Sequence, residues 1–280
     1  MPDFGIFRGF NDKLFGDKLY AGQLPINLGM VKSDFPDAIL FFSRVSAAGG
    51  TLSATEQSAI ITLVEQMKTN GIWDKMKAIY PMVGASAAAC AQNLKSSSYT
   101  GTFNGVVTFA STGITSNGIS GYMDTGIIPL LDLSLNNVHL SFYSRTNNVG
   151  NFSEMGANNG LNNRLQLTFK FATTNFNAMN NNVTQSSYSG TSSGLFAASR
   201  ISPLQFKSFI NGIPSTIIST SQNLSNKEIV LLATNNDGIK NQWSTRQCAF
   251  ASIGDGLTDT EASNLYTAVQ AFQTTLSRQV

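Results

Sequence analysis

The stretch from residue 99 to residue 253 most constrains the fold of this chain. About eleven short runs of β-branched and aromatic residues follow one another there, separated by Gly, Asn and Ser turns and by no helical pattern. In the clearest hairpin, Asn211-Gly212 follows the run 205–210, and Asn-Gly favours the positive φ values of a tight type I′ turn. Consecutive strands without intervening helices form antiparallel layers. We therefore predict a mainly β fold, a two-sheet antiparallel sandwich. The expected strands are 102–109, 121–126, 138–145, 152–156, 164–171, 175–180, 194–200, 205–210, 215–220, 228–234 and 247–253.

Helices are expected on both sides of this stretch. Pro36 suits the first turn of a helix over 36–45. Ser53 with Glu56, and Thr258 with Glu261, have the spacing of a capping box, and apolar residues follow each pair at intervals of three and four. We predict a helical hairpin and connector packed on the sandwich, and a C-terminal helix that packs on the sandwich edge or on the hairpin. The resulting parts are 34–98 for the hairpin and connector and 99–280 for the sandwich with its closing helix.

The first 33 residues differ from the rest of the chain. Their apolar side chains recur among glycines and charges and fit neither a helical nor an alternating period. Such a segment is too apolar for a solvated tail and too rich in Gly for a lone helix. We predict an extended anchoring arm, 1–33, that docks on its own domain or on a partner subunit. Its anchoring residues would be Phe4, Phe7, Phe10, Leu14, Phe15, Leu19 and Leu24.

The charge content excludes several partners. Charged residues are 12% of the chain and the formal net charge is +2, so no strong field is available to hold nucleic acid or an anionic membrane. No apolar run reaches the roughly 20 residues of a membrane helix, and the first residues lack a signal-peptide core. Synthesis in a reducing compartment is therefore expected. Cys90 and Cys248 are expected to be buried free thiols, although the sequence leaves a bridge between them open.

Residues for catalysis or metal binding are sparse. His139 is the single histidine, and strand alternation places it opposite Val138 and Leu140, on a face open to solvent or to a ligand groove. With two cysteines, it supplies three of the four ligands of a usual structural zinc site. Glu154 has no second acid in its strand, so the paired carboxylates of a glycosidase are missing. We predict no catalytic residue, no metal and no cofactor.

Four residues between 235 and 255 could supply a cation site. Asp237, Asp255 and the adjacent Asn235 and Asn236 carry oxygen ligands suited to calcium. Asn-Asn-Asp-Gly is also the composition that a tight turn requires, and we favour the turn.

Uncharged amide side chains gather in several loops beside aromatic residues. Asn, Ser and Thr there can bind a sugar through hydrogen bonds while a ring stacks on it, or they can simply form a neutral surface. If a glycan binds, the contacting residues would be Tyr143, Arg145, Asn147 and Trp243.

Four segments carry a resemblance to a known family, namely 53–57, 72–84, 133–147 and 249–259. They resemble segments of tailed-bacteriophage virion structural proteins, a likeness that runs from about Asp34 to the C-terminus. The motifs are structural, and no functional residues come with them. The family is described as a concanavalin A-like, laminin-G-like jelly roll, which agrees with the predicted sandwich.

The resemblance implies a non-enzymatic virion protein, made in the host cytoplasm and exposed on the particle. It would be a tail or fibre component or a head-decoration protein, anchored to other virion proteins by its arm. The displayed jelly roll would bind host surface glycans, and a homo-oligomer, preferably a trimer, is expected. The alternative is a glycan-cleaving virion depolymerase on the same fold.

Overall fold

The computed structural model describes residues 35–160, 163–171, 174–181, 184–187 and 190–280. The predicted arm, with its seven anchoring residues, lies outside the described residues. Residues 35–280 form one compact unit.

Two sheets make up the body of this unit, and within the described residues they contain eight and nine strands. Every strand pair is antiparallel except β15 with β7. The predicted two-sheet antiparallel jelly-roll sandwich is confirmed. The eight-stranded sheet contains β1 (Met76–Tyr80), β3 (Val107–Ala110), β4 (Gly113–Ser116), β6 (Val138–Ser144), β11 (Gly194–Arg200), β12 (Gln205–Ile210), β13 (Ile213–Ile218) and β17 (Cys248–Gly254). The nine-stranded sheet contains β2 (Thr102–Asn104), β5 (Tyr122–Asp124), β7 (Met155–Asn158), β8 (Arg164–Phe171), β9 (Thr174–Asn181), β10 (Thr184–Ser187), β14 (Val230–Leu231), β15 (Thr234–Asn236) and β16 (Ile239–Asn241).

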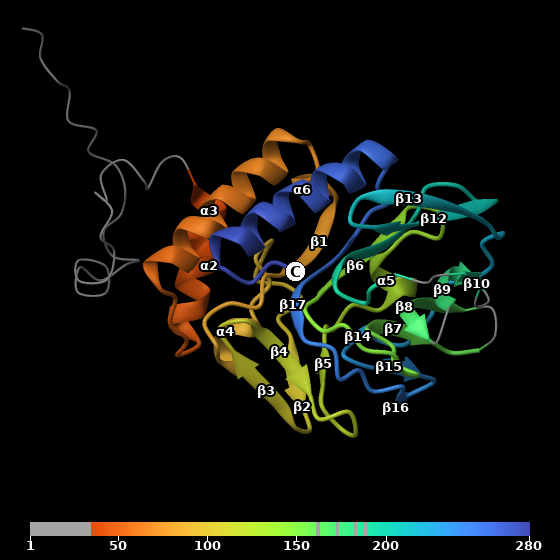
Figure 1. Cartoon of the computed structure of the whole chain (residues 1–280), viewed down its shortest axis with the longest axis horizontal. Coiled ribbons are helices and arrows are strands. Elements are labelled where there is room, and N and C mark those ends of the chain that lie inside the picture. The colour runs from red at the N-terminus through yellow and green to blue at the C-terminus, as the bar shows by residue number, and fades with distance from the viewer. Residues whose placement is uncertain (1–34, 161–162, 172–173, 182–183, 188–189) are drawn as a thin grey trace, which may run out of the picture. The chain divides into compact units, whose positions relative to one another are not determined.

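A third layer, of helices, covers the eight-stranded sheet. Helices α3 and α6 lie side by side across its outer face, with α2 next to α3 (Figure 1). The helical segments are α2 (Pro36–Ala47), α3 (Ala54–Thr69), the 3₁₀ turn Trp73–Lys75, α4 (Ala87–Cys90), α5 (Pro129–Asp132) and α6 (Asp259–Thr275). The closing helix thus packs on the predicted hairpin and on a sheet face rather than on a sheet edge.

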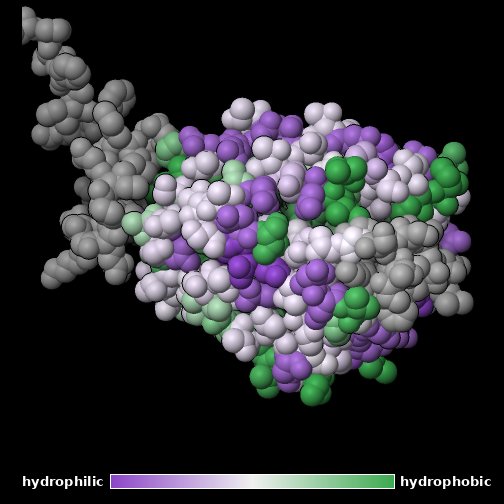
Figure 2. Space-filling model, in the orientation of Figure 1, coloured by the Kyte–Doolittle hydropathy of each residue, from purple (hydrophilic) through white to green (hydrophobic). Residues whose placement is uncertain are grey.

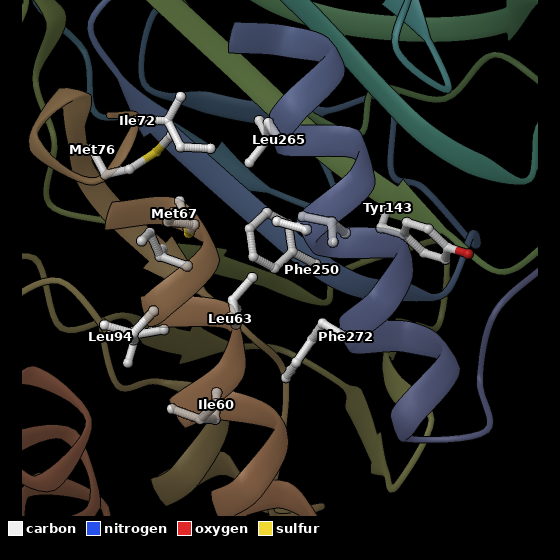
Figure 3. Close-up of a cluster of buried hydrophobic side chains, with 14 of the residues drawn as sticks. Ile60, Leu63, Met67, Ile72, Met76, Leu94, Tyr143, Phe250, Leu265 and Phe272 are labelled. Carbon is white, nitrogen blue, oxygen red and sulfur yellow. The ribbon is translucent and has the colours of Figure 1, made fainter. Parts of the chain in front are cut away.

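This arrangement creates two hydrophobic cores. The first lies between the helices and the eight-stranded sheet, where Leu63 of α3 and Phe272 of α6 converge on Phe250 of β17 (Figure 3). The second lies between the two sheets and contains Phe142, Phe169 and other buried side chains. The eight-stranded sheet is therefore covered on both faces.

Local sequence signals account for the element ends. Both capping boxes form: Ser53 Oγ and Thr258 Oγ1 accept the backbone N–H of Glu56 and Glu261, whose carboxylates accept the N–H of the capping residues. In the β12–β13 hairpin, Asn211 and its following glycine have φ of 50° and 79°, as the predicted turn requires.

Strand β1 is an element that the sequence pattern did not reveal. Residues 76–80 were expected to lie in a connector, but they pair with β17 and so belong to the eight-stranded sheet. The ranges 34–98 and 99–280 consequently share one sheet. The sequence analysis also missed β4, β10 and β16, which have only three or four residues each.

The prediction that the polar face of β6 meets solvent or a groove is wrong. His139 is fully buried, because the elements outside this sheet cover it. Its Nδ1–H donates to the Asp255 carbonyl at 2.6 Å, and Nε2 accepts from Ser252 Oγ at 3.0 Å. Both ring nitrogens are therefore satisfied in the neutral form, and burial lowers the pKa of His139 to about 4. The hydrogen bond to the Asp255 carbonyl opposes this shift of the pKa, the positive charge of Lys75 adds to it, and the negative charge of Glu261 opposes it.

A buried neutral histidine predicts a pH-dependent stability. At pH values between the ordinary histidine pKa of about 6.5 and the lowered pKa of the folded protein, His139 binds a proton in the unfolded chain but not in the folded chain. Stability from this group is complete above the unfolded pKa and is lost as the pH falls toward 4. We expect the change from about pH 7.5 to about pH 5 to remove about 2 kcal/mol through His139 alone. In urea titrations at the two pH values, His139→Gln should show a correspondingly smaller pH dependence. An unchanged dependence in the variant would contradict the assignment.

Cys90 and Cys248 are free and buried, as expected, and they form no disulfide with each other. Burial raises the pKa of Cys90 to about 12 and raises the pKa of Cys248 as well. Both thiols are therefore protonated core residues with weak nucleophilic character.

Candidate functional site

An aromatic pair lies at the surface beside the nine-stranded sheet. Tyr122 comes from β5, and Trp243 follows β16, where a bridge to Ser153 fixes its backbone. The two ring centroids are 5.8 Å apart at an interplanar angle of 49°, and both side chains are partly exposed. Lys240 Nζ lies 5.7 Å from the centre of the Tyr122 ring. The two rings present a mixed aromatic and cationic surface to solvent.

A chain of amide side chains adjoins the aromatic pair. Gln166 Nε2 donates to Gln242 Oε1 at 3.0 Å, and Gln242 Nε2 donates to Asn151 Oδ1 at 2.8 Å. Gln166 Nε2 also lies 3.3 Å from Ser153 Oγ and 3.1 Å from Thr168 Oγ1. These bonds fix the orientation of the two glutamine side chains. We call Tyr122, Trp243, Lys240, Asn151, Gln166 and Gln242 the aromatic–amide site.

Gln242 has a backbone conformation that residues other than glycine rarely adopt, with φ of 52°. Its carbonyl accepts the N–H of Ser153 at 2.7 Å, so the main chain and the side chain are both held. Such strained positions often occur where a fold positions functional groups. The residue that precedes Trp243 is therefore held through both its main chain and its side chain.

Of the predicted glycan-contacting residues, Trp243 lies in this site. Tyr143 does not, and its prediction is wrong, because helix α6 covers its ring (Figure 3). Its hydroxyl donates to Gln270 Oε1 at 3.0 Å and accepts from Val280 N at 3.0 Å. Tyr143 therefore joins the C-terminal helix to the sheet.

Arg145 and Asn147 lie in the loop that follows β6, where their side chains make hydrogen bonds within the protein. Arg145 donates to the Arg278 carbonyl at 2.6 Å and to Gln247 Oε1 at 2.8 Å. Asn147 is exposed, and its Oδ1 accepts the backbone N–H of Ser192 at 3.0 Å. A glycan contact by either residue stays a prediction.

Sequence reasoning missed Tyr122, Gln166 and Gln242. Gln166 alternates with two core leucines of β8, a pattern that assigns it to the outer face of the sheet. That signal was in the sequence. The meeting of Tyr122 with Trp243, by contrast, follows from the strand order and carries no local sequence signal.

Glu154 is neutralised by an arginine. Its Oε1 lies 2.6 Å from Arg246 Nη1, and both side chains are fully buried. Ser244 Oγ and the backbone N–H of Phe169 also donate to this carboxylate, at 3.2 and 3.1 Å. Burial raises the pKa of Glu154, and the guanidinium opposes that shift. Glu154 therefore faces a cation, whereas a glycosidase would place a second carboxylate across a groove from it.

The Asn-Asn-Asp-Gly segment forms a turn. Asn235 Oδ1 accepts the N–H of Gly238 at 3.0 Å, and Asp237, at φ of 53°, pairs with Lys227 at 3.2 Å. Asp255 lies elsewhere in the fold, where its backbone carbonyl accepts a hydrogen bond from His139. Within the described part of the chain, no group of three or more His, Cys, Asp or Glu side chains is arranged to hold a metal. No helix among the described residues is long and apolar enough to cross a membrane.

Comparisons with known proteins find likeness at the level of structure only. No family model matches the sequence, and no curated protein matches it. Domain 4 of the arabinanase AbnA from Geobacillus stearothermophilus aligns with 68% of this chain and 98% of its own, at 13% identity and a TM-score of 0.42. A mutant Trypanosoma rangeli sialidase aligns over 77% of this chain and 39% of its own, at 11% identity and a TM-score of 0.46. A receptor-binding domain aligns over 72% of this chain and 52% of its own, at 16% identity and a TM-score of 0.46. Likeness of this extent identifies neither a family nor a ligand.

Proposed function

We propose that this chain is a carbohydrate-binding β-sandwich protein and that the aromatic–amide site contacts the sugar. The observation that carries the proposal is the partly exposed Tyr122–Trp243 pair beside a fixed row of carboxamides. A pyranose ring presents C–H groups on one face and hydroxyls around its edge. An aromatic ring can stack on the C–H face of the sugar, and amide groups can form hydrogen bonds with its hydroxyls.

The amide row keeps hydrogen-bonding capacity for a ligand. Gln166 is 4% exposed and its Nε2 already has three acceptors, so it positions Gln242 rather than meeting a ligand. Gln242 and Asn151 each have two N–H donors and an oxygen with two lone pairs, and the bonds of the row use only part of these. Because those bonds also fix the glutamine orientations, a ligand would meet groups that are already positioned. Preorganisation of this kind lowers the entropic cost of binding.

The rest of the surface supports the same proposal. It is mostly uncharged and polar, with apolar side chains scattered across the visible face (Figure 2). Such a surface offers little attraction to nucleic acid and leaves recognition to hydrogen bonds and stacking.

Replacing the stacking ring tests the site. In a glycan array with the full chain, Trp243→Ala is expected to weaken binding of every bound glycan at least about tenfold, because aromatic anchors contribute most of the energy of such contacts. Leu204→Ala is a matched control, since Leu204 is 64% exposed and lies in the turn before β12 of the other sheet. Equal binding by wild type and Trp243→Ala would contradict the site.

We further propose that the sandwich is a non-enzymatic structural component of a bacteriophage virion, in a tail, fibre or head-decoration position. The sequence resemblance supports this role, and residues 1–33 would anchor the protein to other virion proteins. Exposure on the particle and assembly into a homo-oligomer, with a trimer favoured, belong to the same proposal. The pairing of Glu154 with Arg246 supports binding without cleavage.

Deleting residues 1–33 tests the virion role. The truncated protein is expected to lose incorporation into phage particles, as measured by immunoblotting of purified particles. Light scattering of the full chain before and after deletion would show whether the arm also holds the oligomer together. Undiminished incorporation of the truncated protein would contradict the anchoring role.

A further inference from the structure

Three exposed apolar residues lie on loops that approach the chain next to the aromatic–amide site. Val106, Ile119 and Val149 are 59%, 73% and 55% exposed. We call these three residues the apolar rim. They come from three loops, the β2–β3 turn, the β4–β5 loop and the loop after β6.

Specific contacts bring these loops to the site. The N–H of Asn117 donates to the Val106 carbonyl at 3.2 Å, which joins the first two loops. A Cβ on Gly118 would lie 2.6 Å from Thr245 Cγ2, and Asn148 Nδ2 donates to Thr245 Oγ1 at 3.2 Å. The second and third loops therefore meet at Thr245, two residues beyond Trp243. Ile119 and Val149 each adjoin a residue that contacts Thr245.

The charges near the site disfavour an acidic ligand. Asp124 lies on β5 with Tyr122, and its partner in β14 is Val230, two residues after Glu228. Burial raises the pKa of the Tyr122 hydroxyl, and Asp124 and then Glu228 raise it further, so both carboxylates act on the site. Lys240 is the cation positioned against the Tyr122 ring. A carboxylated sugar would approach two negative charges and one positive charge.

We infer that the site takes a neutral, N-acetylated hexosamine in preference to an unsubstituted or an acidic sugar. This inference rests on the proposed carbohydrate binding. The acetamido group combines a methyl, which matches the apolar rim, with an amide N–H and C=O, which match Asn151 and Gln242. An unsubstituted hexose offers a hydroxyl at that position and leaves the apolar rim in water.

Calorimetric titration of the full chain with three oligosaccharides tests the inference. The probes are the β1–4 trisaccharide of N-acetylglucosamine, the β1–4 trisaccharide of glucose, and sialyllactose. We expect the acetylated trisaccharide to bind about tenfold more tightly than the glucose trisaccharide, as burial of one methyl group and one satisfied amide would give. Sialyllactose should bind more weakly than the acetylated trisaccharide. Equal affinity for the first two, or tighter binding of sialyllactose, would overturn the inference.

Variants separate this inference from the proposed function. Ile119→Ser and Val149→Ser should reduce the preference for the acetylated trisaccharide while the affinity for the glucose trisaccharide changes little. Ile213→Ser is the matched control, because Ile213 is also 73% exposed but lies on β13 of the other sheet. A preference that survives both rim substitutions would overturn the inference while carbohydrate binding stands. Binding of none of the three sugars would contradict the proposed function together with it.

Discussion

Replacing Arg246 with methionine is expected to lower the free energy of unfolding by about 3–5 kcal/mol, because it leaves the Glu154 carboxylate buried without its cation. Arg246 has no exposed surface, and its guanidinium lies 5.0 Å from the rings of both Phe152 and Phe169. It also donates to the Asn148 carbonyl at 2.9 Å. Urea denaturation at neutral pH, followed by far-UV circular dichroism, measures the loss.

A double variant distinguishes the charge effect from lost packing. Glu154→Met combined with Arg246→Met removes both charges, and replacement of a buried ion pair by apolar residues is often neutral. The double variant is therefore expected to be more stable than Arg246→Met alone. A single variant that loses less than about 1 kcal/mol would show that the pair contributes little. A double variant that is less stable than the single one would contradict the assignment of the loss to the unpaired Glu154 charge.

Replacing Arg278 with methionine is expected to cost about 3 kcal/mol, because four backbone carbonyls, that of Ser111 at 3.4 Å among them, lose a charged donor at once. Arg278 is 1% exposed, and it donates to the carbonyls of Pro81, Met82 and Ala249 at 2.7, 2.8 and 2.9 Å. These residues adjoin β1 or belong to β17, so the side chain ties the C-terminal segment to the sheet.

Thermal unfolding and carboxypeptidase digestion measure the effect of Arg278→Met. The variant should unfold at a lower temperature and lose its last residues faster than the wild type. Lys77→Met is the control, since Lys77 is an exposed cation on β1 itself and should change stability by less than about 0.5 kcal/mol. Similar digestion rates for both variants would contradict the role of Arg278.

The sequence indicated the strands and helix starts well where the signal is local. Alternation predicted β8, β11 and β12 with their observed bounds, and the two capping boxes marked the starts of α3 and α6. The alternation of residue types along β6 also assigned its side chains correctly to the two faces of the sheet. It could not show that helices cover the second face, which is why His139 and Tyr143 were expected in contact with solvent or ligand.

Buried charges were harder to anticipate. Arg246 and Arg278 stand in polar sequence surroundings that are typical of surface residues. Their burial depends on partners from distant parts of the chain, the Glu154 carboxylate for one and backbone carbonyls for the other. A single sequence contains no local signal for such pairings.

Only part of the candidate site was predicted, because the rest also depends on contacts between distant parts of the chain. Trp243 was identified as an aromatic residue among amides, a local property. Tyr122 and Gln166 reach it because β5 and β8 belong to the sheet that also holds β16. The strand order therefore decides which polar and aromatic side chains share a surface, and only the three-dimensional structure provides that order.

Tryptophan fluorescence of the full chain, titrated with neutral oligosaccharides, tests the binding site most directly. The chain has two tryptophans, and Trp73 is 5% exposed within the core beneath the helices, so a ligand-dependent change reports on Trp243. We predict a saturable change that persists in Trp73→Phe and disappears in Trp243→Phe. A saturable change that persists in Trp243→Phe, or the absence of any change with every neutral oligosaccharide, would contradict sugar stacking on Trp243.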